Sequence, residues 1–186
     1  EFELPELKLL VDSVQSSKFI THKKTLSLIE KIERLASRHE AKLLHRQVFV
    51  QNRVKTMNES VYYNVDEIST AISQEKRIRF KYFEYNSKKE RQFRKNGEKY
   101  EVSPFALMWD NENYYMLAFD SLSQNMKHYR VDKMVEIEIT DESREGTVEF
   151  EKIDMSSYSK KVFSMFAGES KMVRIKFANH LAGTVI

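Results

Sequence analysis

The chain has 186 residues, of which 41% are hydrophobic and 32% are charged, and its formal net charge is +3. This balance excludes a disordered tail, and the absence of Cys excludes disulfide scaffolds, thiolate zinc sites and thiol nucleophiles. No stretch approaches the roughly 18 apolar residues of a membrane helix, and the start is acidic where a signal peptide is basic. We therefore expect a cytoplasmic protein without a membrane contact. Because the chain starts with Glu1 and stops within an apolar run, we also expect a fragment of a longer protein.

Four short helices are predicted in the first 75 residues. The first begins at Pro5, a residue that suits the first helical position, and Thr21 is the candidate N-cap of the second. Ser37 and Glu40 form a capping box for the third, and we expect Asn64 to cap the fourth. The apolar stripes at helical spacing are Leu7, Leu10, Val11 and Val14; Leu28, Ile29, Ile32 and Leu35; Ala41, Leu43 and Leu44; and Val65, Ile68 and Ile72. Such short helices need a packing partner, and the same chain and a second copy are about equally compatible with these stripes.

From residue 77 the apolar period changes to two, which predicts strands. Ile78, Phe80 and Tyr82 form an apolar face there. Strands are predicted at residues 77–83, 100–108, 114–119, 127–131 and 135–140, with turns at 96–97 and 110–113. Five short antiparallel strands favour a small barrel or a strongly curled sheet.

Beyond Gly146 the composition becomes helical again. We expect a helix that is capped by Asp154 and ended by Gly168, then a strand at residues 171–177. Asn179 is the candidate cap of a last helix.

The charge is unevenly distributed along the strand region. Residues 76–99 contain ten basic and three acidic side chains, a net charge of +7, whereas residues 130–151 contain eight acidic and three basic ones, a net charge of −5. A basic, aromatic-rich segment suits an anionic ligand or the phosphates of a nucleic acid. A solvated basic hairpin explains the same charge equally well.

Motifs of catalysis and of metal or cofactor binding are missing from the sequence. The four glycines are too far apart for a dinucleotide fingerprint, a P-loop or a nucleophile elbow, and no two of the five histidines have the spacing of helical metal ligands. We therefore expect no enzyme, no cofactor and no metal.

One pair of side chains suggests a ligand. His128 and Arg130 share one face of a predicted strand, and an Arg can hold a phosphate or carboxylate through two hydrogen bonds. The alternative is that Arg130 forms a surface ion pair with Asp132 or a nearby Glu.

Three blocks of the sequence, at residues 102–107 (VSPFAL), 113–120 (NYYMLAFD) and 128–134 (HYRVDKM), resemble the WYL-domain family of bacterial transcription regulators. The Trp-Tyr-Leu triplet of the family stands here as Tyr114-Tyr115-Met116, so only the central residue is retained, and Trp109 is not the family tryptophan. The resemblance covers roughly residues 76–140.

This resemblance implies an α+β protein with three parts. Residues 1–75 would be a helical connector and dimerisation segment, residues 76–146 a small Sm-like antiparallel β-barrel, and residues 147–186 a linker helix with the start of a C-terminal α/β extension. The implied function is the ligand-sensing and oligomerisation portion of a regulator. Such a portion forms a homodimer, binds a nucleotide or single-stranded nucleic acid, and reaches duplex DNA only through a helix-turn-helix module that this chain lacks.

The resemblance also implies a ligand pocket, whose candidate residues are Tyr82, Ser103, Tyr115, His128 and Arg130. The two tyrosines fit a role as core aromatics as well, and Ser103 precedes Pro104, where it fits the shaping of a strand end. Two functions of other classes remain open: a free-standing nucleic-acid-binding barrel and a structural dimerisation module without a ligand.

Overall fold

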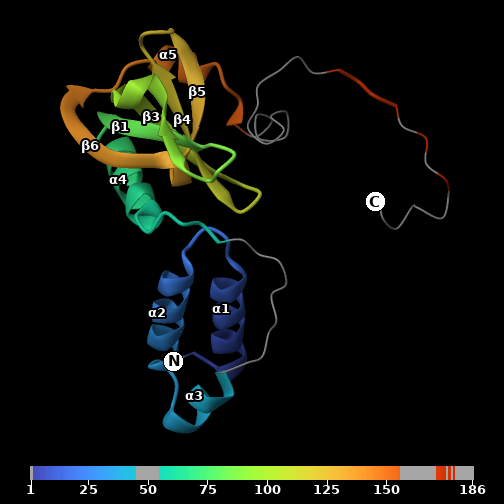
Figure 1. Ribbon diagram of the computed structural model, residues 1–186. Helices are drawn as coiled ribbons and strands as arrows, with labels where there is room; N and C mark the ends of the chain where they lie inside the picture. The colour runs from blue at the N-terminus through green and yellow to red at the C-terminus, as the bar shows by residue number, and fades with distance from the viewer. Residues whose placement is uncertain (1, 45–54, 156–170, 175, 177, 179–186) are drawn as a thin grey trace.

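The computed structural model describes residues 2–44, 55–155, 171–174, 176 and 178. Four helices precede a curled antiparallel sheet, which confirms the predicted α+β fold (Figure 1). The helices are α1 (Leu4–Ser16), α2 (His22–Glu33), α3 (Arg38–Leu44), α4 (Val61–Ser73) and, after the sheet, α5 (Thr147–Glu151). The strands are β1 (Lys76–Tyr85), β2 (Arg91–Phe93), β3 (Tyr100–Asp110), β4 (Asn113–Asp120), β5 (Asn125–Arg130) and β6 (Met134–Ser143). No helix of the described residues is both long and apolar enough to cross a membrane.

The second and third helices begin at the caps that the sequence predicts. The Thr21 side chain accepts a hydrogen bond from the Lys24 amide at 3.2 Å, and Ser37 and Glu40 exchange hydrogen bonds as a capping box. Together with α1, these helices bury a small core of their own, centred on Leu7, Val11 and Leu44. Packing within the same chain therefore accounts for part of the predicted apolar stripes, although Leu35 follows α2 and is 60% exposed.

The predicted cap of the fourth helix is wrong. Helix α4 begins at Val61 with Ser60 as its N-cap residue, so Asn64 lies within the helix. Asn64 is buried, and its side-chain amide donates to the carbonyls of Val131 at 3.3 Å and Met134 at 2.8 Å. The sequence pattern of a cap was misleading because this Asn donates to backbone carbonyls at the corner between β5 and β6 and not to the first turn of its own helix.

A second buried Asn joins the same corner. The Asn58 amide donates to the carbonyls of Asp132 at 3.0 Å and Met134 at 3.4 Å, while its Oδ1 accepts from the Ser60 amide at 3.1 Å. The short turn η2 (Val131–Lys133) between β5 and β6 is therefore held by the start of α4.

The sheet is curled but open. Its strand order is β2-β1-β3-β4-β5, and β6 pairs with β1. No pairing among the described residues joins β5 to β2 or to β6, so the strands form a half-barrel with a gap between its ends. The sequence missed β2, whose three residues are all exposed and give no alternating pattern.

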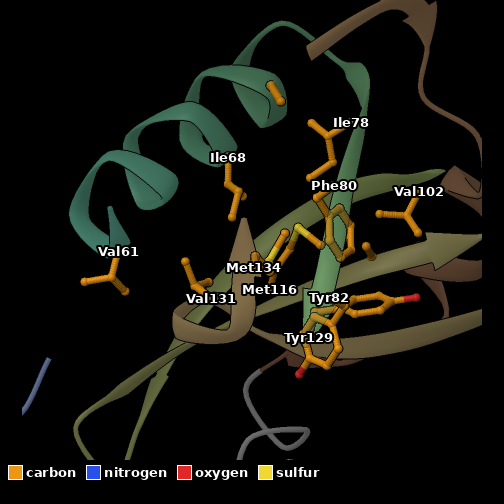
Figure 2. Close-up of a cluster of buried hydrophobic side chains, with 12 residues drawn as sticks. Val61, Ile68, Ile78, Phe80, Tyr82, Val102, Met116, Tyr129, Val131 and Met134 are labelled. Atoms are coloured by element: carbon orange, nitrogen blue, oxygen red, sulfur yellow. The ribbon is translucent and has the colours of Figure 1, made fainter. Parts of the chain in front are cut away.

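The main core lies between α4 and the sheet (Figure 2). Ile68 and Ala71 of the helix pack against Phe80 of β1 and Met116 of β4, all of them fully buried. Helix α4, assigned above to the connector, thus completes the core of the sheet.

A shorter C-terminal segment covers the opposite face of the sheet. Gly146 precedes α5, which the sequence did not predict, and Phe150 of this helix stacks on Phe105 with 4.7 Å between the ring centroids. The helix expected from Asp154 to Gly168 and the cap expected at Asn179 lie outside the described residues, apart from the first positions of that helix. The strand expected at 171–177 is not formed at its described positions, 171–174 and 176, where Met172 and Val173 are exposed.

Candidate anion-binding pocket

The basic residues of β1 do not form an open cationic surface. Because β6 pairs with β1, the acidic segment of the chain lies beside the basic one. Arg77 pairs with Glu101, Glu142 and Glu145; Arg79 with Glu101 and Glu142; Lys81 with Glu136; and Lys99 with Glu138. The cations of β1 at positions 77, 79 and 81 are therefore neutralised by neighbouring carboxylates, and attraction of an anion has to come from other cations, including those of the +7 segment that lie beyond β1.

A pocket of about 700 Å³ lies between the residues after β2 and the β4–β5 turn. We call it the tyrosine pocket. It is lined by Tyr82, Arg94, Lys95, Tyr100, Asp120, Leu122, Ser123, Met126, Lys127, His128 and Tyr129.

Three tyrosines give the pocket its name. The ring centroids of Tyr82, Tyr100 and Tyr129 lie 5.7 to 6.1 Å from one another, with the planes at steep angles. Burial raises the pKa of Tyr82 and of Tyr129, so both hydroxyls stay protonated at neutral pH.

Three cations line the same pocket. The Lys95 ammonium lies 4.1 Å from the centroid of the Tyr100 ring, and the Arg94 guanidinium lies 5.6 Å from that of Tyr82 while it pairs with Glu84. The Lys127 ammonium pairs with Asp120 at 2.5 Å. Burial raises the pKa of Asp120, but hydrogen bonds from Lys127 and from two backbone amides outweigh burial and hold it below its usual value. Among the residues that the structure describes, the lining thus carries three cations and one carboxylate.

The positions after β2 adopt an unusual backbone. Lys95 and Asn96 have φ angles of 48° and 53°, within the short helical turn η1 (Arg94–Gly97). The Asn96-Gly97 signal in the sequence correctly predicted a turn here. What it could not show is that the turn carries Arg94 and Lys95 to the tyrosines.

Two of the five residues predicted for the site, Tyr82 and His128, line the tyrosine pocket. Burial lowers the pKa of His128, so its imidazole is neutral at neutral pH and adds no positive charge. The Tyr82 hydroxyl accepts a hydrogen bond from the Arg130 amide at 3.1 Å.

The other three predicted residues lie elsewhere. Tyr115 is buried beside Met108 and Leu117, and it lies opposite Arg130 in the β4–β5 register. Ser103 is buried, and its hydroxyl accepts a hydrogen bond from the Glu145 amide at 2.8 Å, which ties the segment after β6 to β3. Neither of these two side chains lines the pocket.

The side chain of Arg130 is held by its own chain. Its Nε and Nη2 donate to the two carboxylate oxygens of Asp132 at 3.0 and 2.9 Å, and Nη2 also donates to Asn113 Oδ1 at 2.9 Å. The ion pair with Asp132, which was the alternative to a ligand contact, is therefore present.

Strand alternation explains this separation. Tyr129 and Val131 point into the main core, so Arg130, between them, points to the other face, as the sequence predicts. Arg94, Lys95 and Lys127 gave no such signal, because their proximity depends on pairings between distant strands. No group of three or more His, Asp or Glu side chains in the described part of the chain is placed to hold a metal ion.

The comparisons with known proteins identify one region. The family model of the WYL domain matches residues 63–139, from within α4 to β6. Among solved structures, the proteasome accessory factor B/C (PafBC) of Arthrobacter aurescens is similar with a TM-score of 0.39 and 16% identity. That match covers 47% of this chain and only 13% of the PafBC chain. No curated protein matches the chain.

Proposed function

Since residues 63–139 are a WYL domain, we propose that this chain is the effector-binding portion of a bacterial transcription regulator. The effector is a nucleotide or a single-stranded nucleic acid, and it binds in the tyrosine pocket without undergoing a reaction. Binding in the cytoplasm controls the attachment of the regulator to duplex DNA, which is the task of a helix-turn-helix module outside this chain.

The observation that carries the proposal is that aromatic rings and cations line one pocket. Proteins that bind single strands combine a positively charged groove for the phosphates with aromatic side chains for the bases. The tyrosine pocket provides both, with Tyr100 next to Lys95 and Tyr82 next to Arg94.

The first prediction concerns the charge of the pocket. Replacing Lys95 by Gln should weaken the binding of a short oligothymidylate about tenfold to a hundredfold, because a charge-assisted contact is worth roughly 1.5 to 3 kcal/mol. The dependence of log Kd on log salt should also become shallower by about 0.7. Fluorescence anisotropy at several salt concentrations measures both quantities.

Two further variants make this experiment specific. Lys88→Gln removes the same charge from an exposed position that does not line the pocket, and it should bind as the wild type does. Arg130→Ala should also bind normally, because Arg130 is engaged by Asp132 and Asn113. Loss of binding in Arg130→Ala with normal binding in Lys95→Gln would move the site to the opposite face of the sheet.

We also propose that the chain forms a homodimer through its helical segment. Several apolar side chains of this segment remain exposed after the helices have packed: Phe2, Leu9 and Leu26 are 56%, 67% and 53% exposed. Pairing on palindromic DNA sites requires regulators to assemble with two-fold symmetry. Sedimentation at micromolar concentration should give twice the monomer mass of 22.1 kDa, and Leu9→Glu should return the monomer. A wild-type species of 22.1 kDa would refute dimerisation of this chain.

A further inference from the structure

A buried hydroxyl of the tyrosine pocket has no partner. Tyr129 is 5% exposed, and its Oη makes no hydrogen bond with any residue that the structure describes. In Figure 2 this hydroxyl points away from the apolar side chains of the core. A buried polar group without a partner is unfavourable and uncommon in a native protein.

A second unpartnered hydroxyl lies in the same lining. Ser123, in the β4–β5 turn, has a buried Oγ that also lacks a hydrogen-bond partner among the described residues. Its backbone is held by Asp120, whose Oδ1 accepts from the Ser123 amide at 3.4 Å. The pocket therefore contains two hydroxyl groups that the described chain leaves unbonded, one from β5 and one from the turn before it.

The neighbouring tyrosine shows that the lack of a partner is not a general property of this cluster. Tyr82 lies 5.7 Å from Tyr129, centroid to centroid, and is about as deeply buried at 8% exposure. Its hydroxyl nevertheless accepts from the Arg130 amide. Tyr82 thus has a structural hydrogen bond, whereas the hydroxyl of Tyr129 is left without one.

We propose that the hydroxyls of Tyr129 and Ser123 donate hydrogen bonds to one oxygen-bearing group of the bound effector. This inference rests on the proposed function and extends it, because it assigns a neutral subsite beside Arg94, Lys95 and Lys127. The cations attract the phosphate, and the two hydroxyls select ligands that place an acceptor oxygen between the tyrosines and the β4–β5 turn. An inorganic phosphate ion can contact the cations but has no second group that reaches the two hydroxyls. Thymidylate should therefore bind more tightly than inorganic phosphate.

The test compares two Tyr→Phe substitutions in the same cluster. Tyr129→Phe should weaken the binding of thymidylate and of a short oligothymidylate about threefold to tenfold, since it removes one hydrogen bond. The melting temperature without ligand should stay the same or rise, because an unsatisfied buried hydroxyl is removed. Tyr82→Phe is the matched control and should lower the melting temperature, because its hydroxyl has a partner in the folded chain. Ser123→Ala should weaken binding and leave the melting temperature unchanged.

The outcomes separate this inference from the function on which it rests. If Lys95→Gln loses affinity while Tyr129→Phe and Ser123→Ala bind as the wild type does, the pocket binds the effector but the hydroxyl subsite is refuted. If Tyr129→Phe lowers the melting temperature as much as Tyr82→Phe does, the hydroxyl is structural and the inference is also refuted. If the wild type binds neither thymidylate nor the oligonucleotide, the proposed function itself fails.

Discussion

Replacing Gly146 by Ala should lower the free energy of unfolding by about 2 to 5 kcal/mol. Gly146 has a φ of +86°, a conformation that costs any other residue energy. A Cβ atom at this position would also lie 2.2 Å from Cγ and 2.6 Å from Cβ of Phe119, which is 3% exposed. Because the clash involves the root of the Phe119 side chain, rotation of the ring cannot relieve it.

The chain provides a matched control for this substitution. Gly97 has nearly the same φ, +87°, but a Cβ atom at that position would have no neighbouring atom within 4 Å. Gly97→Ala should therefore show the backbone cost alone, about 1 to 2 kcal/mol. Urea unfolding of both variants gives the difference, which measures the contact with Phe119. Equal losses would contradict the close approach of Gly146 to the sheet.

Replacing Asn64 by Asp should lower the free energy of unfolding by about 3 to 5 kcal/mol at neutral pH. The substitution keeps the shape of the side chain but replaces two donors by a carboxylate that faces the carbonyls of Val131 and Met134. Burial and the carbonyl oxygens would raise the pKa of the new carboxyl in the folded state above its unfolded value. The loss of stability relative to the wild type should therefore be smallest in acid and grow as the pH rises through the unfolded-state pKa of the new carboxyl.

An exposed Asn tests whether burial causes this effect. The Asn125 amide also donates to a backbone carbonyl, that of Ser123 at 2.6 Å, but the residue is exposed and water can replace the hydrogen bond. Asn125→Asp should change stability by less than about 0.5 kcal/mol. Thermal unfolding of both variants between acid and neutral pH provides the comparison. A pH-independent loss in Asn64→Asp would show that the new carboxyl is not buried in the folded state.

The sequence predicted those features that depend on neighbours in the chain. The caps at Thr21 and Ser37 and the turn at Asn96-Gly97 follow from side chains that bond within a few residues, and the structure has all three. The alternation in β5 likewise placed Tyr129 and Arg130 on opposite faces, and in the structure Tyr129 belongs to the core.

Features that depend on contacts between distant parts of the chain could not be predicted from the sequence. Asn64 has the residue type and spacing of a cap, but its partners are 67 and 70 residues away. The sequence could not show which part of the basic segment is neutralised, because the register of β1 with β6 places acids beside the basic residues of β1 and leaves Lys95 in the pocket lining. The three cations of the pocket come from the turn η1 and from β5, which are far apart in the sequence, so the local charge pattern marked Arg94 and Lys95 as basic but could not place Lys127 beside them.

The pairing of β1 with β6 also affects the risk of aggregation while the chain is being translated. Translation produces β1 roughly fifty residues before β6, so the nascent strand waits with an unpaired edge, the kind of edge on which chains aggregate. Arg77, Arg79 and Lys81 make this waiting edge strongly cationic, and two such strands repel each other. Once β6 has been translated, its glutamates form ion pairs with these cations, so β6 can pair with β1 without charge repulsion. The positive charges of β1 thus disfavour pairing between two nascent chains and favour pairing with β6 of the same chain.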